Sequence, residues 1–435
     1  MPIRKLSLLA ILIASPFAAI AADSGGGSIT LADALARALR GSPELAAYSY
    51  ELRAAEARTL QAGLRPNPEL GLDIESPTGS GAFADGSQMQ DTLTLSQLVE
   101  LGGKRPARIF AAEAGRAVVE WEYQVKRVEV LKTTTLAFID ALAAQRRLEL
   151  AEEVVKVSDE AVKVTEQRVG VGKVSAVESI RAKVAVSSAR IDVEQARRDI
   201  ATARGNLAAQ WGAREADFGS VRGDLAPHKG GPSLHTLRQR LLGNPDLARR
   251  TAEREKRAAM LAKEQTLARP DVTVFAGPRM IGKGDDATFV AGFSIPLPIS
   301  NRNQGNIAEA RANLDKLSEE KRAAEARAFA ALNEAFQKLT GASREIEILE
   351  ESVIPGAQDA EKQLNDGYIA GRFTHFEVLD ARRTLNAARA QQVRALADFQ
   401  KARAEIDALT AQPTELPRPV TAKPIPAQPA PAKRK

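Results

Sequence analysis

Hydrophobic residues follow two different periods along this chain, and the two periods alternate in a fixed order. Long stretches carry apolar residues three and four positions apart, which predicts amphipathic helices. Shorter stretches alternate apolar and polar residues, which predicts strands with one apolar face. A helical region, two strands and two very long helices occur in this order twice. The pattern therefore predicts a duplicated, mostly α-helical chain with four β-strands.

The long helices are predicted where proline is scarce. Residues 113–211 contain no proline and are divided by a turn at 170–175, and residues 307–410 repeat this arrangement with a kink expected at Pro355. Apolar residues keep a coiled-coil spacing in the returning helix of each half. These positions are Val186, Val193, Ile200 and Leu207 in the first half, and, with Gln392 as a polar exception, Val378, Ala381, Leu385, Ala388, Gln392, Ala395, Phe399, Ala402, Ile406 and Leu409 in the second. Each half is thus expected to form a long helical hairpin.

The alternating segments predict one β-hairpin at about 69–98 and another at about 271–296. In the first, Leu70, Leu72 and Ile74 share one face of the strand. Strands of about eight to ten residues have the length of tilted strands that cross a bilayer. Four strands are too few to close a barrel, and open sheet edges are not tolerated at membrane depth. We therefore expect several chains to pool their strands.

The duplication can be followed residue by residue. Gly41–Leu45 returns as Gly243–Leu247 at an offset of 202, and Gly172–Glu178 returns as Gly371–Glu377 at an offset of 199. In both halves Ser42 or Asn244 precedes a proline, which predicts a helix N-cap. The predicted domains are a first repeat at 22–211, a connector at 212–233 and a second repeat at 234–411.

Both ends of the chain differ in composition from these repeats. Residues 1–21 have Arg4 and Lys5, an apolar run and a small-residue cleavage pattern, which predicts a secretory signal peptide. Residues 22–28 are rich in glycine and serine and are expected to be loose. Residues 412–435 are rich in proline, alanine and lysine and are expected to be disordered.

The amino-acid composition limits the partners, cofactors and activities that can be expected of the chain. Aromatic residues make up 4% and charged residues 27% of the chain, which is typical of long helices. The net charge of +6 is spread among interleaved acids and bases, so no nucleic-acid partner is expected. There is no cysteine, and the three histidines are not at metal-ligand spacing. Gly102-Gly103-Lys104 lacks the first glycine of a phosphate loop and predicts a strand-to-helix bend. No enzyme activity, cofactor or metal centre is expected.

Several segments of the chain resemble those of a known protein family. The stretches Ser294–Ile299 and Asn301–Gly305, together with the turns at Gly172 and Gly371, are similar to the TolC-like outer-membrane efflux proteins. The likeness is greatest to the heavy-metal efflux branch, of CzcC and CusC type. It implies a homotrimer whose twelve-stranded barrel, four strands per chain, lies in outer-membrane lipid and continues as a long periplasmic helical duct. It also implies a periplasmic membrane-fusion adaptor and an inner-membrane pump, RND type, as partners.

The resemblance also implies roles for the two long-helix turns. They match the periplasmic tips that dock the adaptor. The residues concerned are Val171, Gly172, Lys173, Val174, Ser175, Gly371, Arg372, Phe373 and Thr374. A purely structural interpretation is also available, because glycine ends helices and Ser175 or Thr374 would cap the next helix.

Four residues beside the tips are candidates for an entrance gate: Glu178, Tyr368, Glu377 and Asp380. Glu377 and Asp380 are three positions apart on one helix face and would form stacked acidic rings in a trimer. The alternative is a solvated charge near a helix N-terminus. Tyr368 matches a gate tyrosine and is expected to hydrogen-bond Glu178. Phe373 replaces an arginine of the family. His375 is a weak candidate for contact with a metal ion.

The function predicted from these features is a passive exit duct of a tripartite efflux system, with heavy-metal cations as the expected cargo. Drug efflux or type I protein secretion through the same fold is the first alternative. A periplasmic coiled-coil scaffold without a pore is the second, and it requires that the alternating segments are not strands.

Overall fold

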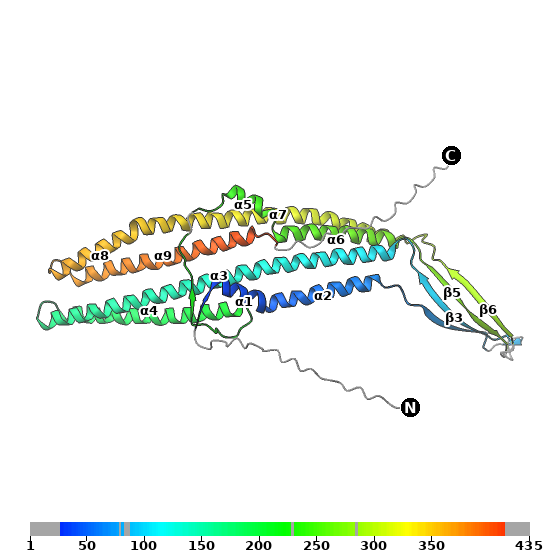
Figure 1. Ribbon diagram of the computed structural model, residues 1–435, viewed down its shortest axis with the longest axis horizontal. Helices are drawn as coiled ribbons and strands as arrows, with labels where there is room; N and C mark the ends of the chain where they lie inside the picture. The colour runs from blue at the N-terminus through cyan, green and yellow to red at the C-terminus, as the bar shows by residue number, and fades with distance from the viewer. Residues whose placement is uncertain (1–26, 78–79, 82–87, 228–229, 283–285, 414–435) are drawn as a thin grey trace, which may run out of the picture.

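The computed structural model describes residues 27–77, 80–81, 88–227, 230–282 and 286–413. A four-stranded sheet occupies one end of a long rod, and the turns of the helical hairpins occupy the other (Figure 1). The predicted signal peptide at 1–21 and all but two residues of the predicted tail lie outside the described residues. None of the helices in the described ranges combines the length and apolar character that a membrane-crossing helix needs.

The elements follow the predicted alternation. The helices are α1 (Leu31–Gly41), α2 (Pro43–Gly63), α3 (Lys104–Gly170), α4 (Ala176–Ala209), α5 (Leu234–Leu241), α6 (Pro245–Leu267), α7 (Gln304–Ile348), α8 (Ile354–Ile369) and α9 (His375–Leu409). The strands are β1 (Ser28–Thr30), β2 (Glu69–Glu75), β3 (Gln90–Val99), β4 (Ser220–Arg222), β5 (Val272–Ile281) and β6 (Asp286–Ser294).

Four of the strands form one antiparallel sheet in the order β2-β3-β5-β6. The register places Leu70 beside Leu95, Leu95 beside Ala276, and Ala276 beside Ala291. Because side chains alternate along each strand, this register gathers the apolar residues on one face. That apolar face carries Leu70, Leu72, Ile74, Leu93, Leu95, Val274, Met280, Phe289 and Phe293, all of them exposed. The opposite face is mainly polar and carries Glu69, Asp73, Glu75, Thr92, Thr94, Ser96 and Arg279.

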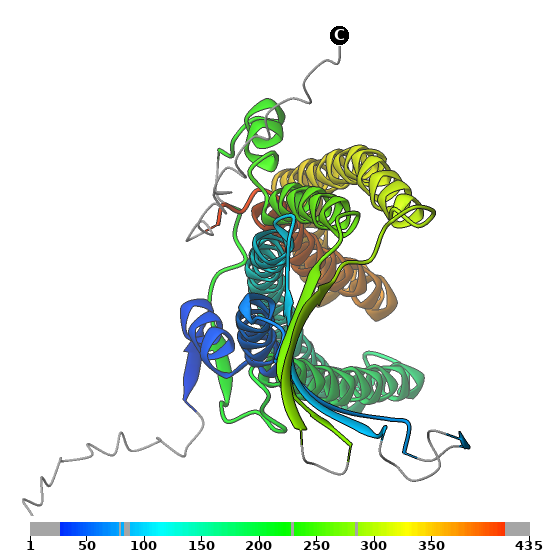
Figure 2. The same cartoon turned by 90° about the vertical axis from the view of Figure 1, so that its right-hand side faces the viewer.

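The outer edges of this sheet, along β2 and β6, have no neighbouring strand within the described chain. Seen along the rod, the sheet and the two helical hairpins lie on an open arc (Figure 2). One chain thus resembles a segment of a tube wall.

The long helices begin earlier than predicted. α3 starts at Lys104 instead of about 113 and has 67 residues, a length of about 100 Å. Gly103 turns the chain with a left-handed φ of 79°, and Pro106 lies in the first turn, where proline removes no helical hydrogen bond. In the second half Asn303, at a φ of 60°, has the same place before α7.

The predicted coiled-coil seams are buried. Val186, Val193, Ile200 and Leu207 are all buried along α4, which packs against α3. Along α9, eight of the ten predicted seam residues are buried, and Gln392 and Leu409 are half-buried. α9 packs against α7, α8 and α3, so the seam joins the second hairpin to the first.

The break predicted at Pro355 is a π-helical turn at Leu349–Val353, between α7 and α8. Pro355 follows in the first turn of α8. Proline has no amide hydrogen and cannot complete the regular helical ladder, so the wider turn accommodates it. The path of the helix bends there (Figure 1).

One pair of strands was not predicted. β1 and β4 pair in parallel, with Ile29 beside Val221, and both side chains are buried. β1 begins at the end of the segment 22–28, which was expected to be loose, and β4 lies in the connector predicted at 212–233. Three-residue strands are too short to produce a recognisable alternation. The prediction of a loose segment at 22–28 is wrong for its last residue, Ser28, which begins β1. Burial of Ile29 beside Phe138 and Leu142 fixes the chain there.

Candidate functional site: the entrance tips and the strand-to-helix junction

The two long-helix turns have the same backbone geometry. Gly172 and Gly371 have left-handed φ values of 72° and 74°. The amide of Lys173 donates to the carbonyl of Arg168 at 2.9 Å, and the amide of Arg372 donates to the carbonyl of Gly367 at 2.8 Å. These are the six-to-one hydrogen bonds that end a helix at glycine. The duplication therefore extends to the hydrogen bonds of each turn.

The expected caps are also present. The Ser175 hydroxyl accepts from the amide of Val177 at 3.3 Å, and the Thr374 hydroxyl accepts from the amide of Glu377 at 3.4 Å. The structural role of these turns is thus established, whereas adaptor docking remains a prediction. The tip side chains Val171 and Phe373 are exposed.

One packing contact of the second tip has no counterpart in the first. A Cβ atom added to Gly367 would lie 2.2 Å from Cδ2 of Phe373, so the Phe373 ring packs directly over α8 and requires glycine there. At the offset of 199 the first half has Arg168 in place of Gly367 and Val174 in place of Phe373. Phe373 therefore belongs to a packing arrangement that the first tip does not have.

Arg168, which the sequence interpretation did not include, links the tips. Its Nη1 and Nη2 atoms donate to the carbonyls of Tyr368 and Ile369 at 2.9 and 3.1 Å. Its guanidinium carbon lies 4.3 Å from the centre of the Tyr368 ring. A cation at the C-terminal end of α8 is favoured by the helix dipole and by the ring face. The signal that could have found it is the mismatch between Arg168 and Gly367 in the repeat.

The predicted hydrogen bond between Tyr368 and Glu178 is not formed. The Tyr368 hydroxyl is buried and has no hydrogen-bond partner among the described residues. Oε1 of Glu178 accepts from Arg181 at 3.4 Å, and its Oε2 is buried without a partner within the described chain. The tyrosine is positioned through its ring and its carbonyl, both held by Arg168.

The two acidic residues of α9 have different surroundings. Oε2 of Glu377 accepts from the amide and the hydroxyl of Thr374, both at 2.8 Å, and completes a capping box. These hydrogen bonds hold the pKa of the Glu377 carboxyl below its usual value, so it is ionised at neutral pH. Asp380 lies three residues further along and is exposed. Glu377 thus lies near the helix N-terminus, as the alternative interpretation has it, and in addition completes a capping box that was not predicted. The acidic ring remains a prediction.

His375 is buried at the start of α9. Its ring centre lies 5.3 Å from that of Tyr368, and neither ring nitrogen has a hydrogen-bond partner among the described residues. Burial lowers the pKa of the His375 imidazole. No group of three or more histidine, cysteine or acidic side chains gathers as a metal site within the described ranges.

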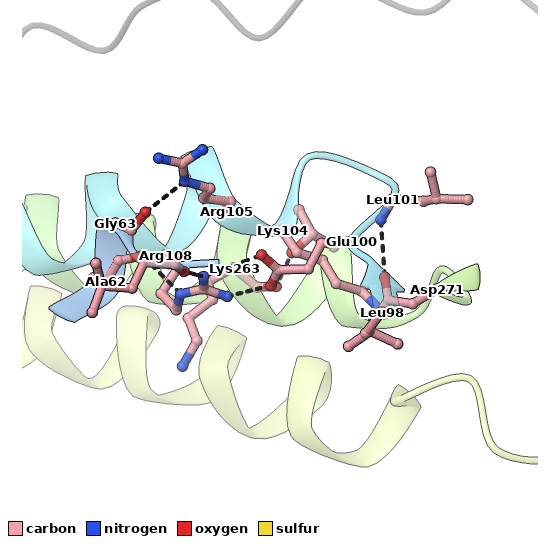
Figure 3. Close-up of polar contacts among 12 residues, drawn as sticks. Ala62, Gly63, Leu98, Glu100, Leu101, Lys104, Arg105, Arg108, Lys263 and Asp271 are labelled. Atoms are coloured by element: carbon pink, nitrogen blue, oxygen red, sulfur yellow. Dashed lines mark hydrogen bonds and ion pairs between the residues drawn. The ribbon is translucent and has the colours of Figure 1, made fainter. Parts of the chain in front are cut away.

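The other end of α3 is fixed to the sheet by ionic contacts (Figure 3). Nζ of Lys104 lies 2.6 Å from Oδ2 of Asp271, and both side chains are largely buried. Oδ1 of Asp271 accepts from the amide of Leu101 at 2.9 Å. This aspartate follows α6 and precedes β5, so it joins the second half of the chain to the bend at Gly102-Gly103. The predicted strand-to-helix bend is confirmed.

Two arginines of α3 fasten the end of α2 at the same junction (Figure 3). Arg105 donates to the carbonyl of Gly63 at 2.6 Å, and Arg108 donates to the carbonyl of Ala62 at 2.8 Å. Arg108 also binds both carboxylate oxygens of Glu100. Cations at the C-terminal end of α2 satisfy carbonyls that have no helical partner. The direction of the strands is thereby fixed relative to the helices.

The sequence profile described as outer membrane efflux protein matches residues 34–213 and again residues 236–412. One match falls in each half of the duplicated chain. The chain belongs to the outer membrane efflux protein family. The predicted membership is confirmed, and the family places this protein among outer-membrane channels for efflux.

Two curated relatives of this efflux protein come from Cupriavidus metallidurans. The cobalt-zinc-cadmium resistance protein CzcC is 31% identical over 93% of this chain and 99% of that protein. The nickel and cobalt resistance protein CnrC is 30% identical over 65% of this chain and 68% of that protein. The resemblance to the heavy-metal branch is thus confirmed at the level of sequence.

Solved structures of efflux channels share the fold. The structure of CusC has a TM-score of 0.74 at 16% identity and covers 88% of this chain and 92% of that one. The outer membrane protein VceC of Vibrio cholerae has a TM-score of 0.72 at 21% identity and covers 88% and 97%. The predicted fold class, helical hairpins joined to strands of a TolC-like channel, is therefore confirmed.

Proposed function

We propose that this protein is the passive exit duct of a tripartite efflux system, and that it carries heavy-metal cations out of the cell. The observation that carries the proposal is the four-stranded sheet, with one apolar face and two edges that have no neighbouring strand among the described residues. In the proposed assembly three chains close a barrel of twelve strands, and the helices continue it into the periplasm as a tube.

The sheet favours a barrel wall over a water-soluble scaffold. Side chains such as Leu72 and Phe293 are more than half exposed on the apolar face. An apolar face of this kind is stable against lipid, whereas in water it would promote aggregation. The unpaired backbone groups of β2 and β6 must also find partners at membrane depth. Joining β2 of one chain to β6 of the next satisfies both edges at once.

The helices support the same closure. Within one chain, α9 of the second half packs against α3 of the first, with ion pairs such as Arg389–Glu153 at 3.3 Å. Because the halves are near-equivalent, the free side of the first half should meet the second half of another chain. That free side carries an exposed apolar stripe on α4: Val177, Ile180, Val184 and Ile191. Their spacing of three, four and seven is typical of a coiled-coil seam without its partner.

The proposed partners follow from this placement. The tips lie at the far end of the rod from the strands (Figure 1), so a periplasmic adaptor would meet Val171–Ser175 and Gly371–Thr374 there. An inner-membrane pump of RND type would supply the energy through that adaptor. The duct itself performs no chemistry. The names of CzcC and CnrC, which refer to resistance to cobalt, zinc, cadmium and nickel, support metal cations as cargo.

The entrance acids provide a test. In a trimer Glu377 and Asp380 would form two acidic rings, which favour cations. We expect the double variant Glu377→Ala, Asp380→Ala to lose several-fold cation-over-anion selectivity, measured from reversal potentials of the purified protein in planar bilayers under a salt gradient. The control is Glu215→Ala, Asp224→Ala, which removes two exposed connector acids and should leave the selectivity unchanged.

The exit duct and the acidic rings can be contradicted by two different results. A wild-type protein that forms no conducting pore would contradict the duct and favour the scaffold. A pore whose selectivity is the same in the wild type and in the tip variant would contradict the acidic rings alone. Conduction of drugs or polypeptides without an effect of metal cations would favour the alternative cargoes.

A further inference from the structure

An unsatisfied polar cluster lies where the two hairpin tips meet. His375 is 3% exposed and Tyr368 is 6% exposed. Both ring nitrogens of His375, the hydroxyl of Tyr368 and Oε2 of Glu178 are buried without hydrogen-bond partners among the described residues. Unsatisfied buried polar atoms weaken packing, since each loses its hydrogen bonds to water. A cluster of them at a single contact between the hairpins makes that contact weaker than a fully hydrogen-bonded one.

The cluster draws side chains from four helices. His375 begins α9, Tyr368 comes from α8, Glu178 from α4 and Arg168 from α3. Arg382, further along α9, is a second nearby cation and is paired with Glu361 at 2.8 Å. The charges facing the imidazole are therefore one carboxylate and two guanidinium groups.

We propose that His375 is a proton-operated latch: uptake of a proton by its buried imidazole releases the α8–α9 tip from the α3–α4 tip. The proposal extends the exit-duct function, because separation of the tips would widen the proposed entrance. The contact itself, however, lies within one chain and can be tested without a pore.

The direction of the effect follows from the surroundings of the ring. Burial is the main cause that lowers the pKa of His375 in the closed tip; Glu178 opposes it, and Arg382 and Arg168 add to it. In an open, hydrated tip the imidazole would titrate near its ordinary value of about 6.5. The closed tip is thus fully favoured above that value. It loses stability as the pH falls from there toward the lowered pKa, by up to about tenfold in the closed-to-open ratio per pH unit.

Among the described residues, few polar contacts oppose the release. Arg168 holds the end of α8 through two carbonyls, and the ion pair of Arg389 with Glu153 lies several helical turns away from the tip. Protonation would bury a positive charge in a contact that contains two guanidinium groups, one of them paired with Glu361, and a single carboxylate, Glu178, that faces the ring. Hydration of the separated tip removes this cost and also satisfies Tyr368 and Glu178.

The test uses the absence of cysteine in the natural chain. Spin labels on Lys173→Cys and Arg372→Cys, both exposed tip positions, report the separation of the two tips by pulsed electron paramagnetic resonance. Labelled protein is diluted with an excess of unlabelled protein, so that distances within one chain dominate. We expect a longer distance population that grows from pH 7.5 to pH 5.5 in the full-length protein.

His375→Leu and His375→Phe are expected to keep the short distance across this pH range. Phenylalanine preserves the ring beside Tyr368, so at least one variant should retain the fold, as checked by its thermal unfolding at pH 7.5. The matched control, His235→Leu, removes an exposed histidine of α5 and should behave as the wild type. A wild-type distance that does not change with pH would overturn the latch, as would a change that persists in both His375 variants. The absence of a conducting pore would instead contradict the exit duct alone.

Discussion

Replacing Leu72 by arginine is expected to prevent most of the protein from assembling in the outer membrane. Leu72 lies at the middle of β2 on the apolar face and is 62% exposed in one chain. An arginine on the lipid face near the bilayer centre costs about 2–4 kcal/mol. In the proposed trimer this cost occurs three times. The fraction of protein recovered from outer-membrane preparations as a heat-resistant oligomer measures the loss.

The neighbouring Asp73→Arg variant is the matched control. Asp73 lies one residue further along the same strand and therefore points to the opposite, polar face. We expect it to assemble nearly as well as the wild type, because its side chain would face the water-filled interior. If both variants assembled equally well, the assignment of the two faces of the sheet would be wrong.

The second large effect is expected for Gly277→Ala, which should separate β3 from β5. A Cβ atom at this position would lie 1.8 Å from the carbonyl oxygen of Leu93 and 3.0 Å from Cα of Thr94. Backbone atoms cannot rotate away as a side chain can, so the cost should exceed the roughly 1–3 kcal/mol of ordinary overpacking. The same assembly assay should show little oligomer, while circular dichroism of the refolded protein keeps its helical signal.

Gly71→Ala is the control for this variant. It lies in the same sheet, but the nearest atom to its added Cβ would be Oγ1 of Thr94 at 3.1 Å, which can rotate away. Normal assembly of Gly277→Ala would mean that β3 and β5 are not held as closely as the structure has them.

The local features of the fold could be predicted because each depends on nearby residues. The heptad from Val378 to Leu409 predicts the buried seam of α9, and the alternation around Leu72 predicts the amphipathic sheet. The turn at Gly371 and its cap at Thr374 follow from backbone rules that need no tertiary contact. The parallel pair β1–β4 was missed because its residues are stabilised by distant helices and not by a pattern of their own.

The contacts between the two tips were predicted less well, because they join residues about 200 positions apart. Tyr368 was placed correctly at the tip, but its expected hydrogen bond to Glu178 is replaced by the contacts of Arg168. His375 was considered as a possible metal contact, and its burial could not be read from a position at the start of a helix. A comparison of the two halves could have identified Arg168 as a functional candidate, since Arg168 and Gly367 differ at equivalent positions.

Cross-linking of the two sheet edges tests the central claim, closure of a barrel by three chains, most directly. Cysteines are introduced at Leu72 on β2 and at Phe289 on β6, both exposed, and are joined in membranes by a flexible bifunctional maleimide. We expect the double variant to give covalent dimers and trimers and no larger species, because each edge meets the opposite edge of the next chain. A mixture of the two single variants should stop at dimers. Monomers alone, or a ladder that continues beyond trimers, would contradict the closed three-chain barrel.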